Sequence, residues 1–357
     1  MIVSKLTLRN FRSYHHLELE FGKGLNIIIG ENAQGKTNIV EAIHFLSLAR
    51  SFRTNESCDL IAQTCQFATI EAKVEQDTTK KEITAIITPS SKKILCNNKP
   101  VRKISDLSKL INVIVFEPKD SLMFNDSPNV RRNFLNVNLS KKSPIYLEAL
   151  MRHERLLQER NLILKKDSID KTQLNVVTKQ LIDASETIVN YRSVYVNEIN
   201  QILSKIITQL KGEKEKAYIE YIPFVPFDKN FKDVALRAYE KNLDSDIKRK
   251  ATQIGIHRED IKMILNGKDM SSYGSQGENR VAVISLKLAP YFLIEDKSKR
   301  PIVVLDDVMS ELDKTRQEKL LTFLRKLEQV FITSVNTNVK NASIYEVKEH
   351  TVTRRNA

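Results

Sequence analysis

The fold of this chain is decided by the stretch Gly30-Glu31-Asn32-Ala33-Gln34-Gly35-Lys36-Thr37-Asn38, which has the spacing G-x-x-x-x-G-K-T. An apolar run at 25–29 precedes it and predicts a buried strand, and apolar residues at helical spacing follow it, as this motif requires. The two glycines let backbone N–H groups point at phosphate oxygens near a helix N-terminus. Lys36 can then reach the β- and γ-phosphates, and the Thr37 hydroxyl can ligate Mg²⁺. The stretch therefore predicts a site for a nucleoside triphosphate.

Size and charge narrow the class of protein. The chain has 357 residues, which is enough for one large domain with an insertion or for two domains. Its net charge of +13 indicates a polyanionic partner, nucleic acid or an anionic membrane surface, although charge also serves solubility. The 3 cysteines lack C-x-x-C spacing, which favours a reducing compartment. Since no signal peptide or membrane-length apolar run occurs, we expect a cytoplasmic protein without a membrane partner.

Strand and helix patterns outline an α/β fold. Alternating apolar and polar residues predict paired antiparallel strands at 5–9 and 16–21, and the alternation returns at 67–74 and 82–88. Apolar runs at 112–116, 301–305 and 330–333 predict buried strands, helices are expected at 281–293 and 314–327, and a last strand ends at 354–355. We therefore expect a mixed sheet with flanking helices and an antiparallel β subdomain.

A helical insertion interrupts this pattern. Residues 145–211 contain neither Gly nor Pro and carry apolar residues at helical spacing, with a turn expected near 165–171. Two limbs of about 35 residues would give an arm of roughly 50 Å. A projecting hairpin and a compact helical subdomain are both open, because no heptad is sustained. We expect 1–140 and 251–357 to form the N- and C-terminal parts of an ATPase head, with the mainly helical insertion at 141–250.

Two carboxylates at the end of a predicted strand supply metal and water chemistry. Asp306 can hold Mg²⁺ together with Thr37, and Asp307 can orient or deprotonate the attacking water. Many such ATPases carry Glu at the second position. Because Asp is one methylene shorter, we expect slow turnover, and a binding module without turnover is the alternative.

The turn Ser275-Gln276-Gly277 distinguishes among phosphate-loop proteins. A Ser-x-Gly turn before a helix can present a hydroxyl and N–H groups to an anion, and taken alone it indicates an ordinary helix cap. Here it precedes the acid pair, which Ser310-Glu311-Leu312-Asp313 follows. This is the arrangement of the ATP-binding-cassette (ABC) class, in which the signature turn of one subunit covers the γ-phosphate held by another. A transporter subunit would not need the helical insertion, and a structural chromosome protein would need a far longer one.

The chain also resembles, essentially from end to end, the RecF family of bacterial recombination proteins. The motifs that carry the resemblance are Leu8 to Tyr14, Gly30 to Asn38 with Glu41-Ala42-Ile43, Arg50 to Thr54, Ser127-Pro128 with Arg131-Arg132 and Phe134-Leu135, Gly255 to Asp260, Ser275 to Arg280, and Leu305 to Asp313. The chain departs from the family's usual residues at Ile256, Glu259 and Glu278-Asn279, where Pro, Asp and Gln-Gln are common.

The resemblance implies an ATPase head related to the SMC proteins but without their long coiled coil. It implies ATP and Mg²⁺ as cofactors, a homodimer in the presence of ATP, and binding to double-stranded DNA and to gap junctions with single-stranded DNA. It further implies action with RecO and RecR to help load RecA at single-strand gaps. An ABC-type ATPase subunit of another DNA-associated or transport complex is the alternative.

These arguments define a set of candidate site residues. Thr333 joins the set because it follows the strand after the acid pair, where related ATPases place a γ-phosphate sensor. Arg12 is a candidate contact to nucleotide or DNA, with an exposed turn arginine as the alternative, and Arg53, Arg131 and Arg132 are either phosphate contacts or ordinary surface or ion-paired residues. The predicted catalytic residues are Lys36, Asp306, Asp307 and Ser275, the metal ligands are Thr37 and Asp306, and the nucleotide contacts are Gly30, Glu31, Asn32, Ala33, Gln34, Gly35, Lys36, Thr37, Asn38, Ser275, Gln276, Gly277, Asp313 and Thr333.

Overall fold

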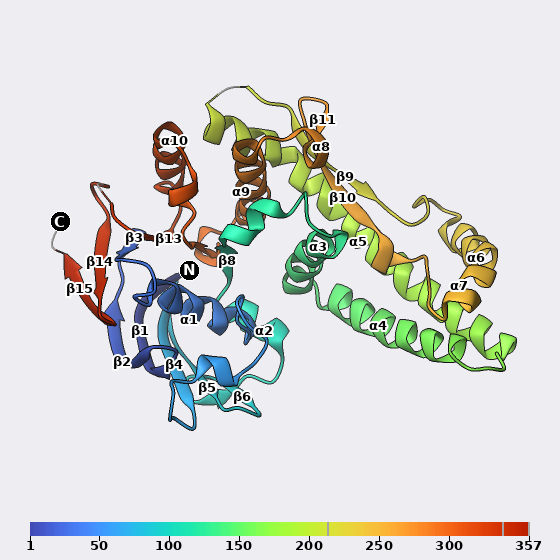
Figure 1. The fold of residues 1–357 in the computed structure, drawn as a ribbon, viewed down its shortest axis with the longest axis horizontal. Helices are drawn as coiled ribbons and strands as arrows, with labels where there is room; N and C mark the ends of the chain where they lie inside the picture. The colour runs from blue at the N-terminus through green and yellow to red at the C-terminus, as the bar shows by residue number, and fades with distance from the viewer. Residues whose placement is uncertain (213, 338, 356–357) are drawn as a thin grey trace. The chain divides into compact units, whose positions relative to one another are not determined.

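The computed structural model describes residues 1–212, 214–337 and 339–355 (Figure 1). The chain divides into two compact units. Unit 1 comprises Met1–Ser121, Ile206–Lys214 and Val283–Ala357, and unit 2 comprises Leu122–Lys205 and Glu215–Ala282. Among the described residues, no helix has both the length and the apolar character to cross a bilayer.

Unit 1 contains a mixed sheet with the order β15-β14-β3-β13-β12-β8. All neighbouring strands in it are parallel except the pair β14 and β15. The predicted buried strands are confirmed, because the side chains of β8 and β12 are buried throughout. The strands are β3 (Gly24–Ile29), β8 (Val113–Phe116), β12 (Ile302–Leu305), β13 (Gln329–Ser334), β14 (Ser343–Lys348) and β15 (Thr351–Arg355).

The antiparallel subdomain predicted from the alternating segments is present as a second sheet in unit 1, with the order β2-β1-β4-β5-β6-β7. Its first two strands pair in the register Leu6 with Leu19 and Leu8 with Leu17, which places their leucines on the core side. The strands are β1 (Ile2–Phe11), β2 (Tyr14–Glu20), β4 (Ala68–Gln76), β5 (Thr79–Ile87), β6 (Lys92–Cys96) and β7 (Lys99–Pro100).

Helix α1 (Lys36–Leu48) follows the phosphate loop and is buried around most of its circumference. Its apolar residues share one core with side chains of both sheets, including Leu6, Ile70 and Phe331. Phe331 belongs to this core, whereas its neighbour Ile332 lines a pocket with residues of α10 (Lys314–Leu324). Because successive side chains of a strand point to opposite faces, α1 and α10 cover opposite faces of the mixed sheet.

Unit 2 is built mainly from helices around the small antiparallel sheet β11-β10-β9. Its strands are β9 (Ala217–Ile222), β10 (Asp260–Leu265) and β11 (Lys268–Asp269). Its helices are α3 (Pro128–Lys142), α4 (Pro144–Leu164), α5 (Lys171–Lys211), α6 (Phe231–Lys241), α7 (Leu243–Arg249) and α8 (Met270–Tyr273). Helix α5 ends in unit 1, and α9 (Gln276–Phe292) begins in unit 2 and ends in unit 1.

The remaining elements of the two units are α2 (Ile104–Leu110) and the short 3-10 turns Cys58–Leu60, Pro118–Leu122, Ile256–Arg258, Lys297–Lys299 and Met309–Glu311.

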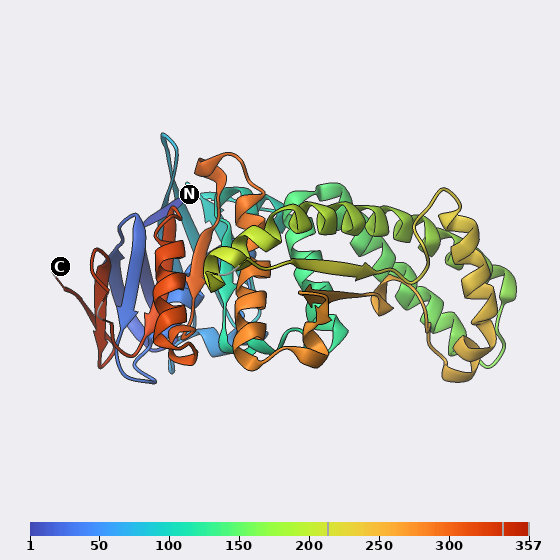
Figure 2. The ribbon, with the colours of Figure 1, turned by 90° about the horizontal axis from the view of Figure 1, so that it is seen from above.

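The predicted helical hairpin is present, with its turn between α4 and α5, and Figures 1 and 2 show these helices side by side. The expectation of two limbs of similar length was wrong, since α4 has 21 residues and α5 has 41. Helix α4 starts at Pro144, with the Ser143 side chain as its cap, whereas no Gly or Pro interrupts α5. The three-part division at 140 and 250 stays a prediction.

The last predicted strand is confirmed, since β15 ends at Arg355. The sequence did not indicate its partner β14, which forms a hairpin with β15 where the chain reverses at Glu349 and His350, both with positive φ. A reversal through two left-handed residues usually needs Gly or Asn, so this sequence carries no turn signal there. Helix α9 begins at Gln276 rather than at 281, because the Ser275 turn starts the helix directly.

Candidate functional site

The phosphate loop joins β3 to α1 in unit 1, and its glycines are required by close contacts. Gly30 has φ +154°, and a Cβ atom there would lie 2.4 Å from the Val347 carbonyl oxygen. Gly35 has φ +101°, and a Cβ atom there would lie 2.8 Å from the Tyr14 hydroxyl, which donates to the Gly35 carbonyl. Residues 31–33 are exposed. The loop therefore keeps its curved backbone open to solvent while its two ends are tightly packed.

Lys36 begins α1 and folds back over the loop. Its Nζ donates to the carbonyl oxygens of Gly30 and Glu31, each at 2.7 Å. Burial lowers the pKa of the Lys36 ammonium, and the nearby carboxylates of Asp307 and Asp306 oppose that shift. The structure thus brings together the loop lysine and the acid pair, as the sequence predicted. A cation placed so can attract phosphate oxygens.

Thr37, in the first turn of α1, meets Asp306, which directly follows β12 and is remote from it in sequence. The Thr37 hydroxyl donates to Asp306 Oδ1 at 2.9 Å, and the Thr333 hydroxyl donates to the same oxygen at 2.7 Å. Burial raises the pKa of Asp306, while the hydrogen bonds from Thr333 and then Thr37 lower it. A hydroxyl and a carboxylate that converge on one point form a ligand pair suited to Mg²⁺. In the described part of the chain, no group of 3 or more His, Cys, Asp or Glu is arranged so that it could hold a metal ion.

Asp307 has a strained backbone beside this pair. Its φ is +52°, and its N–H donates to the Thr333 hydroxyl at 2.8 Å. The Asp307 Oδ1 atom is buried and has no hydrogen-bond partner among the residues that the structure describes. A buried acceptor without a donor suits an atom that holds a water or a metal-bound ligand. Thr333 links the two acids, and its predicted role as a γ-phosphate sensor stays a prediction.

Sequence reasoning missed the importance of Glu41, which lies on α1 with a fully buried carboxylate. Arg12 binds it through two nitrogens, at 2.9 Å and 2.6 Å. Ser51 donates to it at 2.5 Å and Arg53 at 3.2 Å. Arg12 is therefore not an exposed turn arginine but an ion-paired one. A charged residue within the apolar stretch of this helix was the available signal.

Other loop residues are held by neighbouring segments. Asn38 donates to the Ser13 hydroxyl and accepts from Arg53, each at 2.9 Å. The Gln34 side-chain oxygen accepts from the Glu349 N–H at 2.7 Å, so the β14–β15 turn supports the loop. These contacts define the loop's conformation from outside the motif.

The signature turn lies in unit 2, whereas the phosphate loop and acid pair lie in unit 1. Glu278 donates its N–H to the Ser275 hydroxyl at 3.3 Å. In return, the Glu278 carboxylate accepts from the Ser275 N–H at 3.0 Å and from its hydroxyl at 2.8 Å. Gln276 and Gly277 form the first turn of α9. The turn is thus a capping box at the start of a helix.

The remaining candidates have structural contacts. Asp313 caps α10 by accepting from the Arg316 N–H at 2.9 Å, and its nucleotide role stays a prediction. Arg131 is buried and pairs with Asp260 at 2.7 Å. Arg132 donates to the Glu259 carbonyl oxygen at 2.7 Å. The ion-paired alternative therefore holds for Arg131, which is not available as a surface phosphate contact.

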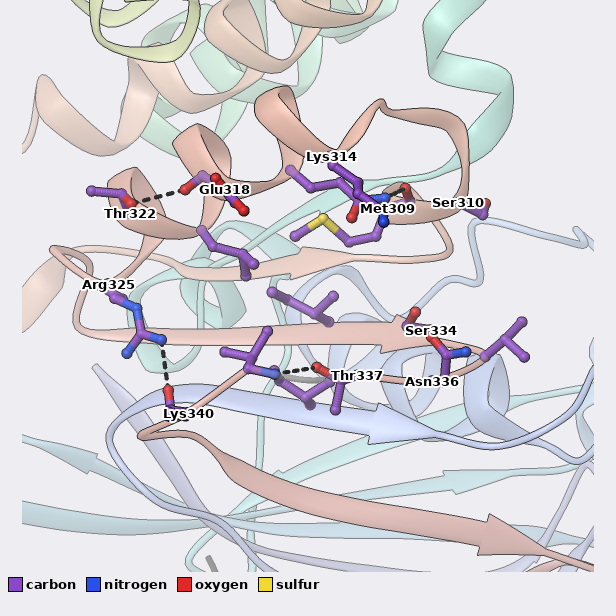
Figure 3. A pocket seen from close by; sticks show the side chains of 16 residues that line it. Met309, Ser310, Lys314, Glu318, Thr322, Arg325, Ser334, Asn336, Thr337 and Lys340 are labelled. Carbon is purple, nitrogen blue, oxygen red and sulfur yellow. Dashed lines mark hydrogen bonds between the residues drawn. The ribbon is translucent and has the colours of Figure 1, made fainter.

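A pocket of about 830 Å³ lies beside α10 and the chain that follows β13 (Figure 3). Its wall includes Arg325, which donates to the Lys340 carbonyl oxygen at 2.6 Å. No phosphate-loop residue lines it. The pocket faces α10, on the side of the mixed sheet opposite to α1, and is therefore separate from the candidate site.

Comparison with known proteins places this geometry in context. The family model described as the RecF/RecN/SMC N terminal domain matches residues 2–355. The DNA replication and repair protein RecF of Halalkalibacterium halodurans is 35% identical over 99% of this chain and 100% of its own length. RecF of Geobacillus kaustophilus is 34% identical over 99% of both chains.

Solved structures of RecF and of an Smc head domain are similar to this chain in fold. The recombination mediator protein RecF with ATP, described as part of the RecFOR pathway, has a TM-score of 0.89 and 28% identity, covering 99% of this chain and 97% of its own. The Smc head domain of Pyrococcus furiosus bound to the C-terminal domain of ScpA has a TM-score of 0.57 and 16% identity over 99% of this chain and 95% of its own. This second likeness concerns the fold alone, and it supports the expected ABC-type head.

Proposed function

The chain belongs to the RecF family, within the RecF/RecN/SMC group of ATPases, and we propose that it is an ATP-dependent DNA-binding protein of replication and recombinational repair. The observation that carries this proposal is the 2.9 Å hydrogen bond between Thr37 and Asp306, which joins the phosphate loop to the acid pair. Membership of this family also argues against the alternative of a transport subunit.

In the proposed site, Lys36 binds the β- and γ-phosphate oxygens of ATP while backbone N–H groups of the loop surround them. Thr37 and Asp306 would hold Mg²⁺, which would supply positive charge to neutralise the phosphates. The Thr37 hydroxyl and the Asp306 carboxylate already converge, and both are oxygen ligands of the kind that Mg²⁺ prefers, so the residues present fit this ion.

Hydrolysis needs a positioned water molecule. We assign that task to Asp307, whose backbone is fixed by the hydrogen bond from its N–H to Thr333. The water oxygen bonds to the γ-phosphorus, the bond from that phosphorus to the bridging oxygen breaks, and the water proton passes to Asp307. The products are ADP and phosphate. Because Asp is shorter than Glu, the water is held less closely and turnover is slow.

The signature turn completes the site only between two copies. Ser275, Gln276 and Gly277 of one chain would cover the γ-phosphate bound to Lys36 of the other, and two-fold symmetry makes two such sites at once. Asp313 would lie at the same interface. ADP lacks the group that the turn contacts, so ATP and not ADP would favour the dimer.

The partners follow from the same family. With a charge of +13, the chain suits double-stranded DNA and gap junctions with single-stranded DNA. The solved RecF structures are described as part of the RecFOR pathway, and we extend this to the present chain. RecO and RecR would act with it to help load RecA, in the cytoplasm where the chromosome lies.

The test compares the wild type with Lys36→Met. The control is Lys23→Met, which makes the same substitution at an exposed lysine outside the phosphate loop. Lys36→Met should lose ATP hydrolysis and remain folded, and Lys23→Met should retain both properties. Sedimentation with a non-hydrolysable ATP analogue should show a wild-type dimer and a monomeric Ser275→Arg variant that still binds the analogue. Unchanged hydrolysis by Lys36→Met would refute the phosphate site. A wild type that stays monomeric would refute the shared site.

A further inference from the structure

The signature turn has a feature that the sequence motif alone does not imply. Both polar hydrogens of Ser275, on the backbone nitrogen and on the hydroxyl, point to one carboxylate oxygen of Glu278, at 3.0 Å and 2.8 Å. The proposed function places Ser275 over the γ-phosphate of a second chain, where the same two hydrogens would be the donors to that phosphate. The turn therefore holds an anion that belongs to its own chain.

We propose that Glu278 is an internal competitor for the γ-phosphate at the signature turn and that it weakens ATP-dependent pairing of two chains. The inference rests on the proposed function, because it concerns how the shared site is regulated. To accept a phosphate oxygen, Ser275 has to release the carboxylate, or else both anions share the turn.

Charge gives the competition its direction. The carboxylate lies in the first turn of α9, a helix of 17 residues, where the helix dipole is positive. A negative side chain there offsets the potential that would otherwise attract a phosphate. It also repels a phosphate that approaches Ser275. Glutamate at this position thus stabilises the free turn and disfavours the occupied one.

The chain offers a conservative way to separate the charge from the cap. Glutamine can replace glutamate in a capping box, so Glu278→Gln keeps an oxygen that can accept from Ser275 but removes the negative charge. Asp233→Asn is a matched control, because Asp233 is an exposed carboxylate in the first turn of α6, also in unit 2. It changes the net charge by the same amount without touching the signature turn.

The experiment measures the dimer dissociation constant by sedimentation, for full-length protein with a non-hydrolysable ATP analogue at low and high salt. We expect Glu278→Gln to dimerise about tenfold more tightly than the wild type at low salt. Each of the two symmetric sites contributes a factor of about three to the dimer dissociation constant, and the two factors multiply. The advantage should shrink at high salt because the repulsion is screened. Asp233→Asn should match the wild type at low and high salt.

The outcomes separate the inference from the proposed function. A wild type that dimerises, with a Glu278→Gln variant that dimerises equally or less well, would overturn the competitor and leave the shared site intact. A tenfold gain that does not depend on salt would also overturn it, since the gain would then not come from charge. If neither protein dimerised with the analogue, the shared site itself would be refuted and the competitor with it.

Discussion

Replacing Thr333 by valine tests the connection between the two acids more directly than removing either acid. The Thr333 side chain is buried, and its hydroxyl makes two contacts: it donates to Asp306 Oδ1 at 2.7 Å and accepts from the Asp307 N–H at 2.8 Å. Valine has nearly the same shape, so the substitution removes both hydrogen bonds without creating a cavity.

The magnitude follows from the two contacts. A hydrogen bond to a charged group contributes about 1.5–3 kcal/mol, and a buried N–H left without an acceptor costs about 1–3 kcal/mol. Because the Thr37 hydroxyl remains on Asp306, we take the lower part of each range. The expected loss in the free energy of unfolding is therefore about 2.5–4 kcal/mol.

The same substitution should change how activity depends on pH. Burial already raises the pKa of Asp306, and the hydrogen bond from Thr333 is the largest of the contributions that lower it. Without that bond the pKa rises further, so the carboxylate is protonated at a higher pH. Since a metal ligand has to be deprotonated, the acidic limb of the ATPase profile should move to higher pH.

The assays are urea unfolding without nucleotide and steady-state ATP hydrolysis as a function of pH. Thr333→Ser keeps the hydroxyl and should restore the wild-type acidic limb. Thr322→Val is the matched control, because that hydroxyl donates to the Glu318 carbonyl within α10, away from the acids. A Thr333→Val protein with wild-type stability and an unshifted acidic limb would refute the reasoning. If it lost only turnover, Thr333 would act as a γ-phosphate sensor alone.

Three further predictions concern the same head and the charge of the chain. Asp306→Asn should abolish Mg²⁺-dependent hydrolysis and raise the melting temperature at neutral pH. Burial raises the pKa of Asp306, so the charged carboxylate lowers the free energy of unfolding at pH values above that pKa. This loss of stability disappears as the pH falls through the pKa. An unchanged or lower melting temperature would contradict this. Glu41→Gln should lower the free energy of unfolding by about 2–3 kcal/mol, a figure that is reduced because Arg53, the second partner of Glu41, is partly exposed. In a double-mutant cycle, the variant with both Glu41→Leu and Arg12→Met should lose less stability than Glu41→Gln, because no charge of the pair is left buried alone. Equal or greater loss in the double variant would count against the pair. Finally, log K for duplex DNA should fall with log salt with a slope near −5 if about six phosphates are neutralised, and salt-independent affinity would make the charge a solubility feature.

The sequence by itself determined the local chemistry of this protein. The G-x-x-x-x-G-K-T loop, the strand before it and the helix after it are contiguous, so one stretch specifies both the backbone curve and the lysine. Alternation of apolar residues likewise predicted the paired strands β1 and β2, because side-chain period is a local property of a strand. The capping box at Ser275 and Glu278 is also local, although only the N-cap was recognised.

Only the tertiary structure decided which distant groups meet. Thr37 reaches Asp306 because β3 and β12 flank β13 in a parallel sheet, which brings their carboxyl ends to one edge. Arg12 and Arg131 look like surface charges in sequence, since the pattern of one segment does not reveal a partner in another. In the folded protein Arg12 pairs with Glu41 and Arg131 with Asp260, because an unpaired charge inside the fold would strongly destabilise it. The β14–β15 turn lacked a sequence signal for a similar reason: the paired strands on either side, and not the turn residues, determine its left-handed backbone.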